Sequence, residues 1–97
     1  MPTYVTLYQW TQEGIENVKE SPERLDAAKK AVEAMGGKLL GFYLVQGRYD
    51  MVAISEGPDD ETAAKTALAI GSKGAVRSET MRAFTEDEYR RIISALP

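Results

Sequence analysis

The chain contains neither cysteine nor histidine. Without cysteine it can form no disulfide, no iron–sulfur cluster and no zinc site of the usual thiolate kind, and it has no thiolate nucleophile. Without histidine it lacks the side chain that most often moves protons at neutral pH and ligates transition metals. Histidine-dependent catalytic triads and histidine metal centres are therefore excluded, and a bound metal would have to be a hard cation held by carboxylates. We expect neither a metal nor another cofactor.

Long apolar runs and an excess of basic charge are also missing. No stretch approaches the roughly 18–20 apolar residues of a membrane span, and the opening segment MPTYVTLYQW lacks the basic and apolar parts of a secretory signal. The net charge is −3 and the isoelectric point is near 4.9, which is unlike a nucleic-acid-binding surface or a polybasic membrane patch. We expect a cytoplasmic protein that binds neither nucleic acid nor membranes.

The composition that remains, 43% hydrophobic and 28% charged residues over 97 positions, predicts one soluble domain spanning residues 1–97. β-Branched and aromatic segments alternate with segments of helical periodicity. Strands are predicted at 3–10, 38–46, 50–56 and 75–84, and helices at 21–37, 57–71 and 85–97, with a short helical turn after Thr11. This βαββαβ order with a terminal helix is typical of a ferredoxin-like α+β fold, which has a four-stranded antiparallel sheet.

The predicted helices carry clear signals at their ends. Ser21 suits an N-cap and Pro22 the first helical position, while Gly36-Gly37 would end that helix. Thr85-x-x-Glu88 forms a capping box before the last helix. Two acidic runs, at 59–61 and 86–88, occupy first helical turns, where the helix dipole favours carboxylates. Because the side chains of adjacent helical residues point in different directions, we expect no metal site there.

Both faces of the predicted sheet are largely apolar. One face of the central hairpin contains Leu40, Phe42, Leu44, Gln46, Tyr49, Met51, Ala53 and Ser55; the other contains Leu39, Gly41, Tyr43, Val45, Asp50, Val52, Ile54 and Glu56. In a ferredoxin-like fold the helices cover a single face, so an isolated chain would expose an apolar patch larger than monomers usually show. We therefore predict a homodimer or higher homo-oligomer in which two sheets pack face to face, as in a dimeric α+β barrel. The terminal helix would extend this contact between subunits.

The central hairpin contains Gly47-Arg48-Tyr49-Asp50, and the chain around it resembles the GYD-domain family of small bacterial proteins, named for a Gly-x-Tyr-Asp signature. The stretches TLYQWTQEGI, SPERLDAAKKAVEAMGGKLLGFYL and VRSETMRAFTEDEYRRI extend the resemblance over essentially the whole chain. The resemblance implies a ferredoxin-like fold of the dimeric α+β barrel type. It implies no activity, because the family is functionally unassigned.

The signature has a structural and a functional interpretation. Gly47-Arg48 suits a tight turn, with pairing across a two- or a four-residue loop, and Asp50 can accept hydrogen bonds from nearby amides. Alternatively, Tyr49 and Asp50 line a cleft and orient a polar ligand. Asp50 shares its predicted face with Val45 and Val52, so a buried carboxylate there would need a partner or a raised pKa.

Other candidates lie on the first and last strands. Tyr4, Tyr8 and Trp10 share a face that suits either a subunit interface or a ligand pocket. Arg77 and Arg82 suit either an edge between subunits or the binding of an anionic ligand. The ligand-binding candidates are Tyr8, Trp10, Tyr43, Tyr49, Asp50, Arg77 and Arg82, and the catalytic candidates are Tyr49 and Asp50.

Two classes of function remain open. The first is a non-catalytic homo-oligomer that binds a small metabolite at a subunit interface or sheet face. The second is a cofactor-independent monooxygenase or isomerase, in which tyrosine and tryptophan side chains orient a small aromatic substrate and Asp50 acts as the base; this rests on fold analogy. A third use of the fold, as an amino-acid-sensing regulatory module, would require a DNA-binding segment for which 97 residues leave no room.

Overall fold

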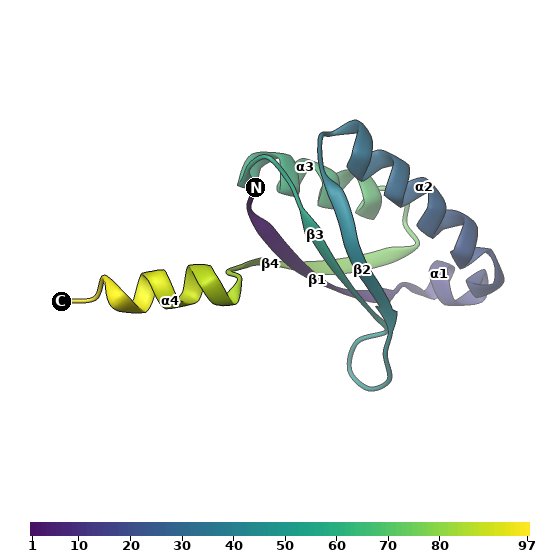
Figure 1. Cartoon of the computed structure of the whole chain (residues 1–97). Coiled ribbons are helices and arrows are strands. Elements are labelled where there is room, and N and C mark those ends of the chain that lie inside the picture. Colours follow the sequence, from purple (N-terminus) through teal and green to yellow (C-terminus); the bar gives the residue numbers. More distant parts are fainter.

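A computed structural model describes residues 1–97 as a four-stranded antiparallel sheet with helices on one of its faces (Figure 1). The strands are β1 (Thr3–Trp10), β2 (Lys38–Leu44), β3 (Met51–Glu56) and β4 (Val76–Ala83), and the helices are α1 (Gln12–Glu16), the 3₁₀ turn η1 (Val18–Glu20), α2 (Ser21–Ala34), α3 (Asp60–Gly71) and α4 (Glu86–Ser94). The strand order β2-β3-β1-β4 places β1 and β3 in the centre and leaves β2 and β4 at the edges. This is the predicted ferredoxin-like α+β fold, with its elements in the predicted order.

Side-chain caps begin three of the helices. The Thr11 hydroxyl accepts a hydrogen bond from the Gly14 amide, and the Asp59 carboxylate accepts one from the Thr62 amide. Both halves of the predicted capping box form, since Thr85 accepts from the Glu88 amide and Glu88 accepts from the Thr85 amide. None of the helices has the combination of length and apolar composition that crossing a membrane would require.

The start of α2 differs from the prediction. Ser21 does not cap this helix, because the chain is already helical through η1 and Ser21 itself has helical backbone angles, φ −61° and ψ −34°. Glu20 stands at the N-cap position without a capping side-chain hydrogen bond. Pro22 still lies in the first turn, where its missing amide proton has no helical partner to lose.

The strand register decides which residues face the helices. Tyr4, Thr6, Tyr8 and Trp10 alternate onto the helix-covered face of β1, together with Met51 and Ala53 of β3. The predicted interface of Tyr4, Tyr8 and Trp10 with a second subunit is therefore wrong, because α2 and α3 of the same chain cover this face (Figure 1). α2 presents Leu25, Ala28, Val32 and Met35 toward the sheet, and these residues recur at the three- and four-residue spacing of one helix face.

A β-bulge in β2 corrects one further assignment. Leu39 pairs with Ser55 but Gly41 pairs with Ile54, so Leu40 is the extra residue in the β2 strand. The bulge moves Leu39 onto the helix-covered face beside Phe42, although simple alternation predicted opposite faces. Leu40 is left 49% exposed.

The second face of the sheet has no cover within the chain, and we call it the open face. Its apolar side chains come from all four strands and are Val5, Leu7, Tyr43, Val52, Ile54 and Met81. Tyr43 is 58% exposed and Met81 43% exposed. The sequence prediction that one apolar sheet face lacks an internal cover is confirmed.

Helix α4 lies outside the layered body. It leaves the end of β4 and projects away from the sheet and from the other helices (Figure 1), which gives the chain a longest dimension of 51 Å against 31 and 18 Å for the other two. Only Phe84 and Thr85 separate β4 from α4. The apolar residues of α4 and its C-terminal end are consequently exposed.

Candidate functional site

A large apolar cavity lies between the sheet and helix α2, and we call it the helix-side cavity. Its volume is about 520 Å³, within the range of about 300–1,000 Å³ that is usual for small-molecule sites. Its walls come from the covered face of the sheet, from α2 and from the end of α3. Tyr8, Trp10 and Phe42 line the sheet side, whereas Leu25 and Val32 line the helix side.

The cavity explains why so few side chains are fully buried. The buried apolar residues are Tyr4, Met51, Ala53 and Ala75, and no α2 residue is buried. Because the space between α2 and the sheet is partly open to solvent, the apolar side chains that line it remain part-exposed. An apolar molecule in this space would remove some of that apolar surface from water.

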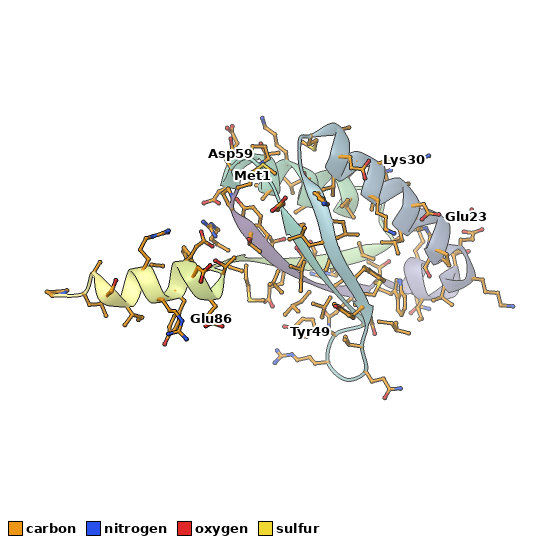
Figure 2. The ribbon with its side chains drawn as sticks, in the orientation of Figure 1. Met1, Glu23, Lys30, Tyr49, Asp59 and Glu86 are labelled. Carbon is orange, nitrogen blue, oxygen red and sulfur yellow. The ribbon has the colours of Figure 1, made fainter.

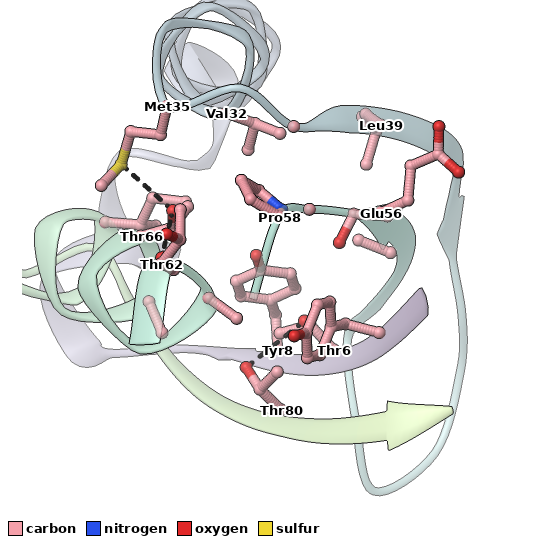
Figure 3. A pocket seen from close by; sticks show the side chains of 18 residues that line it. Thr6, Tyr8, Val32, Met35, Leu39, Glu56, Pro58, Thr62, Thr66 and Thr80 are labelled. Atoms are coloured by element: carbon pink, nitrogen blue, oxygen red, sulfur yellow. Dashed lines mark hydrogen bonds between the residues drawn. The ribbon is translucent and has the colours of Figure 1, made fainter. Parts of the chain in front are cut away.

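A smaller chamber of about 60 Å³ adjoins the helix-side cavity and shares Tyr8, Val32 and Leu39 with it (Figure 3). Hydroxyl groups concentrate there. The Thr6 and Thr80 hydroxyls lie 3.4 Å apart across β1 and β4. The single proton of the Thr66 hydroxyl is within reach of both the Thr62 carbonyl, at 2.9 Å, and the Met35 sulfur, at 3.1 Å. This chamber is the more polar end of a mostly apolar space.

Tyr8 and Tyr4 differ in how their hydroxyls are satisfied. The Tyr4 hydroxyl donates to the Asp60 carboxylate at 2.5 Å, and burial together with this bond raises the pKa of Tyr4 to about 12. Burial also raises the pKa of Tyr8, whose hydroxyl has no hydrogen-bond partner within the chain. Both side chains stay protonated at neutral pH, so Tyr8 can serve as a hydrogen-bond donor but not as a base.

The Gly47–Asp50 signature forms the loop between β2 and β3. The Val45 amide donates to the Asp50 carbonyl at 2.9 Å, which selects the four-residue loop of the two predicted alternatives. Gly47 has φ +115°, a conformation that L side chains rarely adopt.

Asp50 ties this loop to β1. Its carboxylate accepts a hydrogen bond from the Trp10 amide at 2.9 Å, and its own amide donates to the Tyr8 carbonyl at 2.9 Å. The Gln9 side chain adds a bond to the Arg48 carbonyl at 2.8 Å. The partner that the sequence required for the Asp50 carboxylate is therefore a backbone amide.

Tyr49 extends from the loop toward β4 rather than toward the helices. Its hydroxyl donates to the Glu79 carboxylate at 2.9 Å, and that bond raises the pKa of Tyr49. Figure 2 shows Tyr49 at the loop end of the sheet, on the side away from α2. Neither Tyr49 nor Asp50 lines the helix-side cavity or its polar chamber. The two catalytic candidates therefore do not face a substrate held in that cavity, and Glu56 is the carboxylate residue that lines the adjoining chamber.

The remaining candidates lie apart from one another. Arg77 pairs with Gln9 and Arg82 with Tyr4 in a register without a bulge, so their side chains project from opposite faces of β4. Arg82 lies 4.5 Å from the centre of the Phe84 ring and 5.9 Å from that of Tyr4. Tyr43 lies on the open face. The structure brings Tyr8 and Trp10 together at the cavity and separates them from Tyr43, Arg77 and Arg82.

Helix α4 forms a third feature, with an exposed apolar stripe. Tyr89, Ile92, Ile93 and Leu96 share one side of the helix, and they are exposed by 57, 40, 49 and 61%. The opposite side contains Asp87, Arg91 and Ser94. No three acidic side chains anywhere in the chain converge as a metal site would require.

The family profile of the GYD domain matches residues 4–93. The chain belongs to the GYD-domain family. This GYD domain is 33% identical, over 84 residues, to a Thermus thermophilus protein named "Glutamine synthetase and cystathionine beta-lyase binding protein", and the match spans 86% of this chain and 88% of the relative.

Solved structures confirm the fold of the GYD domain. The crystal structure of TTHA0845 from Thermus thermophilus superposes with a TM-score of 0.56 at 26% identity, over 88% of this chain and 95% of that chain. The leucine response regulatory protein of Mycobacterium tuberculosis superposes with a TM-score of 0.57 at 13% identity, over 87% of this chain and 51% of that chain. The latter similarity shows the fold alone.

Sequence reasoning found Tyr8 and Trp10 but missed two features of these sites. The basic residues beside the cavity, Lys29 and Lys73, resemble ordinary surface lysines because nothing local distinguishes them from Lys30 or Lys65. The Tyr49–Glu79 bond joins residues 30 positions apart, so only the strand order predicts it.

Proposed function

We propose that this protein is a non-catalytic binding protein that pairs with a second copy through its open face and binds another protein through helix α4. The observation that supports the binding role is the exposed apolar stripe of α4, on a helix that projects away from the rest of the chain. The Thermus thermophilus relative is named for binding two enzymes. A role in binding enzymes is therefore the first to test for this chain.

The chemistry of α4 suits recognition of a groove on another protein. An amphipathic helix binds such a groove by burying residues spaced three and four apart, and Tyr89, Ile92, Ile93 and Leu96 have this spacing. A helix of nine residues gains little stability by itself in water. The capping box holds its first turn in place, so less order has to be gained on binding.

The open face supports self-association for a separate reason. It presents aliphatic and aromatic side chains from four strands, and a second open face has the shape and polarity to cover it. Sheets that pack face to face bury such residues from both sides. With the open faces joined, the two α4 helices of a dimer would remain available to a partner protein.

The direct test is a binding measurement with the two enzymes named for the relative. Glutamine synthetase and cystathionine beta-lyase would be purified from the organism that this chain comes from and immobilised. Binding of the full chain to each enzyme would be recorded by biolayer interferometry. The variant I93D places a carboxylate in the apolar stripe, whereas S94D places the same group on the polar side one residue later. We expect I93D to weaken binding by about tenfold or more, and S94D to bind nearly as well as the unchanged chain.

Three results would overturn the proposal. One is that neither enzyme binds better than an unrelated immobilised protein. Another is that I93D and S94D bind equally. The third is that I93D halves the molar mass of the protein in light scattering, which would assign α4 to self-association. Circular dichroism of both variants would establish that the sheet remains folded.

A further inference from the structure

The helix-side cavity is distinct from the surfaces that the proposed function uses. It lies under α2 on the covered face of the sheet, whereas the open face and α4 lie elsewhere (Figure 1). Its wall is dominated by aliphatic and aromatic side chains, among them Leu25, Phe42, Met51 and Ile70. Water gains few hydrogen bonds in such a space, so an apolar group is the better occupant.

The charged residues that line the helix-side cavity itself are all basic, whereas Glu56 lines the adjoining chamber. Arg24, Lys29 and Lys73 contribute to the wall of the helix-side cavity, and none of the 15 acidic residues of the chain does. This local excess of cations contrasts with the net charge of −3. Arg24 pairs with Glu20 at 3.2 Å, but Lys29 and Lys73 form no ion pair within the chain. Lys29 and Lys73 are therefore the two lining cations that remain unpaired and available to an anionic group.

From these observations we infer that the helix-side cavity binds an aliphatic or aryl carboxylate. The apolar part of the ligand fills the space between α2 and the sheet, and its carboxylate lies at Lys29 and Lys73. The unpartnered Tyr8 hydroxyl offers a hydrogen bond to a further oxygen atom of the ligand. Binding is non-covalent and requires no cofactor.

Decanoate is the probe for the first experiment, with decanol and decylamine as probes of equal chain length and different charge. Isothermal titration of the full chain below the micellar concentration is expected to show one decanoate site per chain. Decanol should bind about tenfold more weakly and decylamine more weakly still, because only the carboxylate gains the lysine partners. Equal affinity for all three probes would overturn the inferred ligand class.

Matched variants test the location. A28W places an indole in the cavity from α2, and A34W places the same group on the exposed side of that helix. K29Q/K73Q removes the two cations beside the cavity, and K30Q/K65Q removes two cations elsewhere with the same change in net charge. We expect A28W to abolish decanoate binding and K29Q/K73Q to weaken it about tenfold, while A34W and K30Q/K65Q retain it.

Chemical-shift mapping keeps the inference testable even if A28W fails to fold. Decanoate added to the ¹⁵N-labelled full chain should shift the amide signals of cavity residues such as Leu25, Val32 and Ala75. Shifts confined to α4 or to the open face would show adsorption to exposed apolar surface and would overturn the cavity assignment. Equal decanoate affinity in the two lysine double variants would likewise overturn the role of Lys29 and Lys73.

Discussion

At the scale of single residues, Tyr4 links the centre of the sheet to helix α3. It is 4% exposed, and its hydroxyl donates to Asp60 in the first turn of α3. A buried hydroxyl needs such a partner, because leaving it unpaired would cost about 1–3 kcal/mol. The bond therefore fixes the position of α3 over β1 as well as satisfying the tyrosine.

Because of Tyr4, the stability of the protein should also vary with pH in the alkaline range. The pKa of Tyr4 is about 12 in the folded state and 10 when unperturbed, so the folded chain retains a proton that the unfolded chain loses. The free energy of unfolding should accordingly fall as the pH rises from about 10 to about 12, and be insensitive to Tyr4 below that window. Y4F should cost about 1 kcal/mol at pH 7 and reduce the alkaline loss.

Urea unfolding at pH 7, 9.5 and 11 measures both effects. Some alkaline loss should persist in Y4F, because the pKa values of Tyr8 and Tyr49 are raised as well. Y89F, which alters a hydroxyl on exposed α4, serves as the control and should behave like the unchanged chain. An identical pH dependence in Y4F and the unchanged chain would contradict the assignment to Tyr4.

At the scale of elements, the loop between β2 and β3 depends on one glycine for its conformation. Gly47 has φ +115°, and an added Cβ there would meet no atom within 4 Å. The loop is therefore restricted by backbone conformation and not by space. Three hydrogen bonds, from Trp10, Gln9 and the Asp50 amide, then hold it against β1.

G47A should destabilise the protein by about 1 kcal/mol or more, because alanine resists positive φ. G71A provides the control: Gly71 ends α3 with open space around its Cα and without positive φ. Alanine at position 71 should be neutral or slightly stabilising, because alanine has a higher helix propensity than glycine. Thermal unfolding of the two variants makes the comparison, and equal shifts in melting temperature would refute the conformational explanation.

At the scale of the whole molecule, the open face is the surface whose burial would differ between a dimer and a monomer. Ile54 lies near its centre, between Val5 of β1 and Gly41 of β2. A carboxylate at that position is tolerated in water but costs several kcal/mol when a second sheet covers it. I54D should therefore shift the protein from twice the chain mass of 10.7 kDa to the chain mass itself.

L68D is the matched control, because Leu68 is 73% exposed on the outer side of α3. Light scattering after size-exclusion chromatography measures both variants, and circular dichroism checks that the strands persist. A monomeric unchanged chain, or a dimeric I54D, would refute pairing through the open face.

Much of this fold could be predicted from local signals. The four strands, the helix caps and the terminal amphipathic helix follow from side-chain periodicity and from residues such as Thr11, Asp59 and Thr85 that satisfy nearby amides. Predictions from short sequence segments failed where another segment of the chain decides the local structure. Ser21 does not cap α2 because η1 already makes the chain helical, and Leu39 changes face because β2 inserts Leu40 opposite β3.

The candidate site was less predictable than the fold. Tyr8 and Trp10 were candidates for either a subunit interface or a pocket, and Asp50 was expected to need a partner if buried. However, the partner, the Trp10 amide, lies 40 positions away in the sequence. Arg77 and Arg82 were candidates for an edge between subunits or for binding an anionic ligand, and their odd spacing along an unbroken strand places their side chains on opposite faces.

Composition and short-range periodicity were enough to exclude chemistry that depends on histidine or cysteine, to order the helices and strands, and to predict two apolar sheet faces. Tertiary structure alone decided which face the helices cover, what the Asp50 carboxylate binds, and that α2 stands away from the sheet to leave a cavity beside two unpaired lysines. The reason is physical: each of these depends on strand register and on the separation of layers, which no segment of the chain specifies alone.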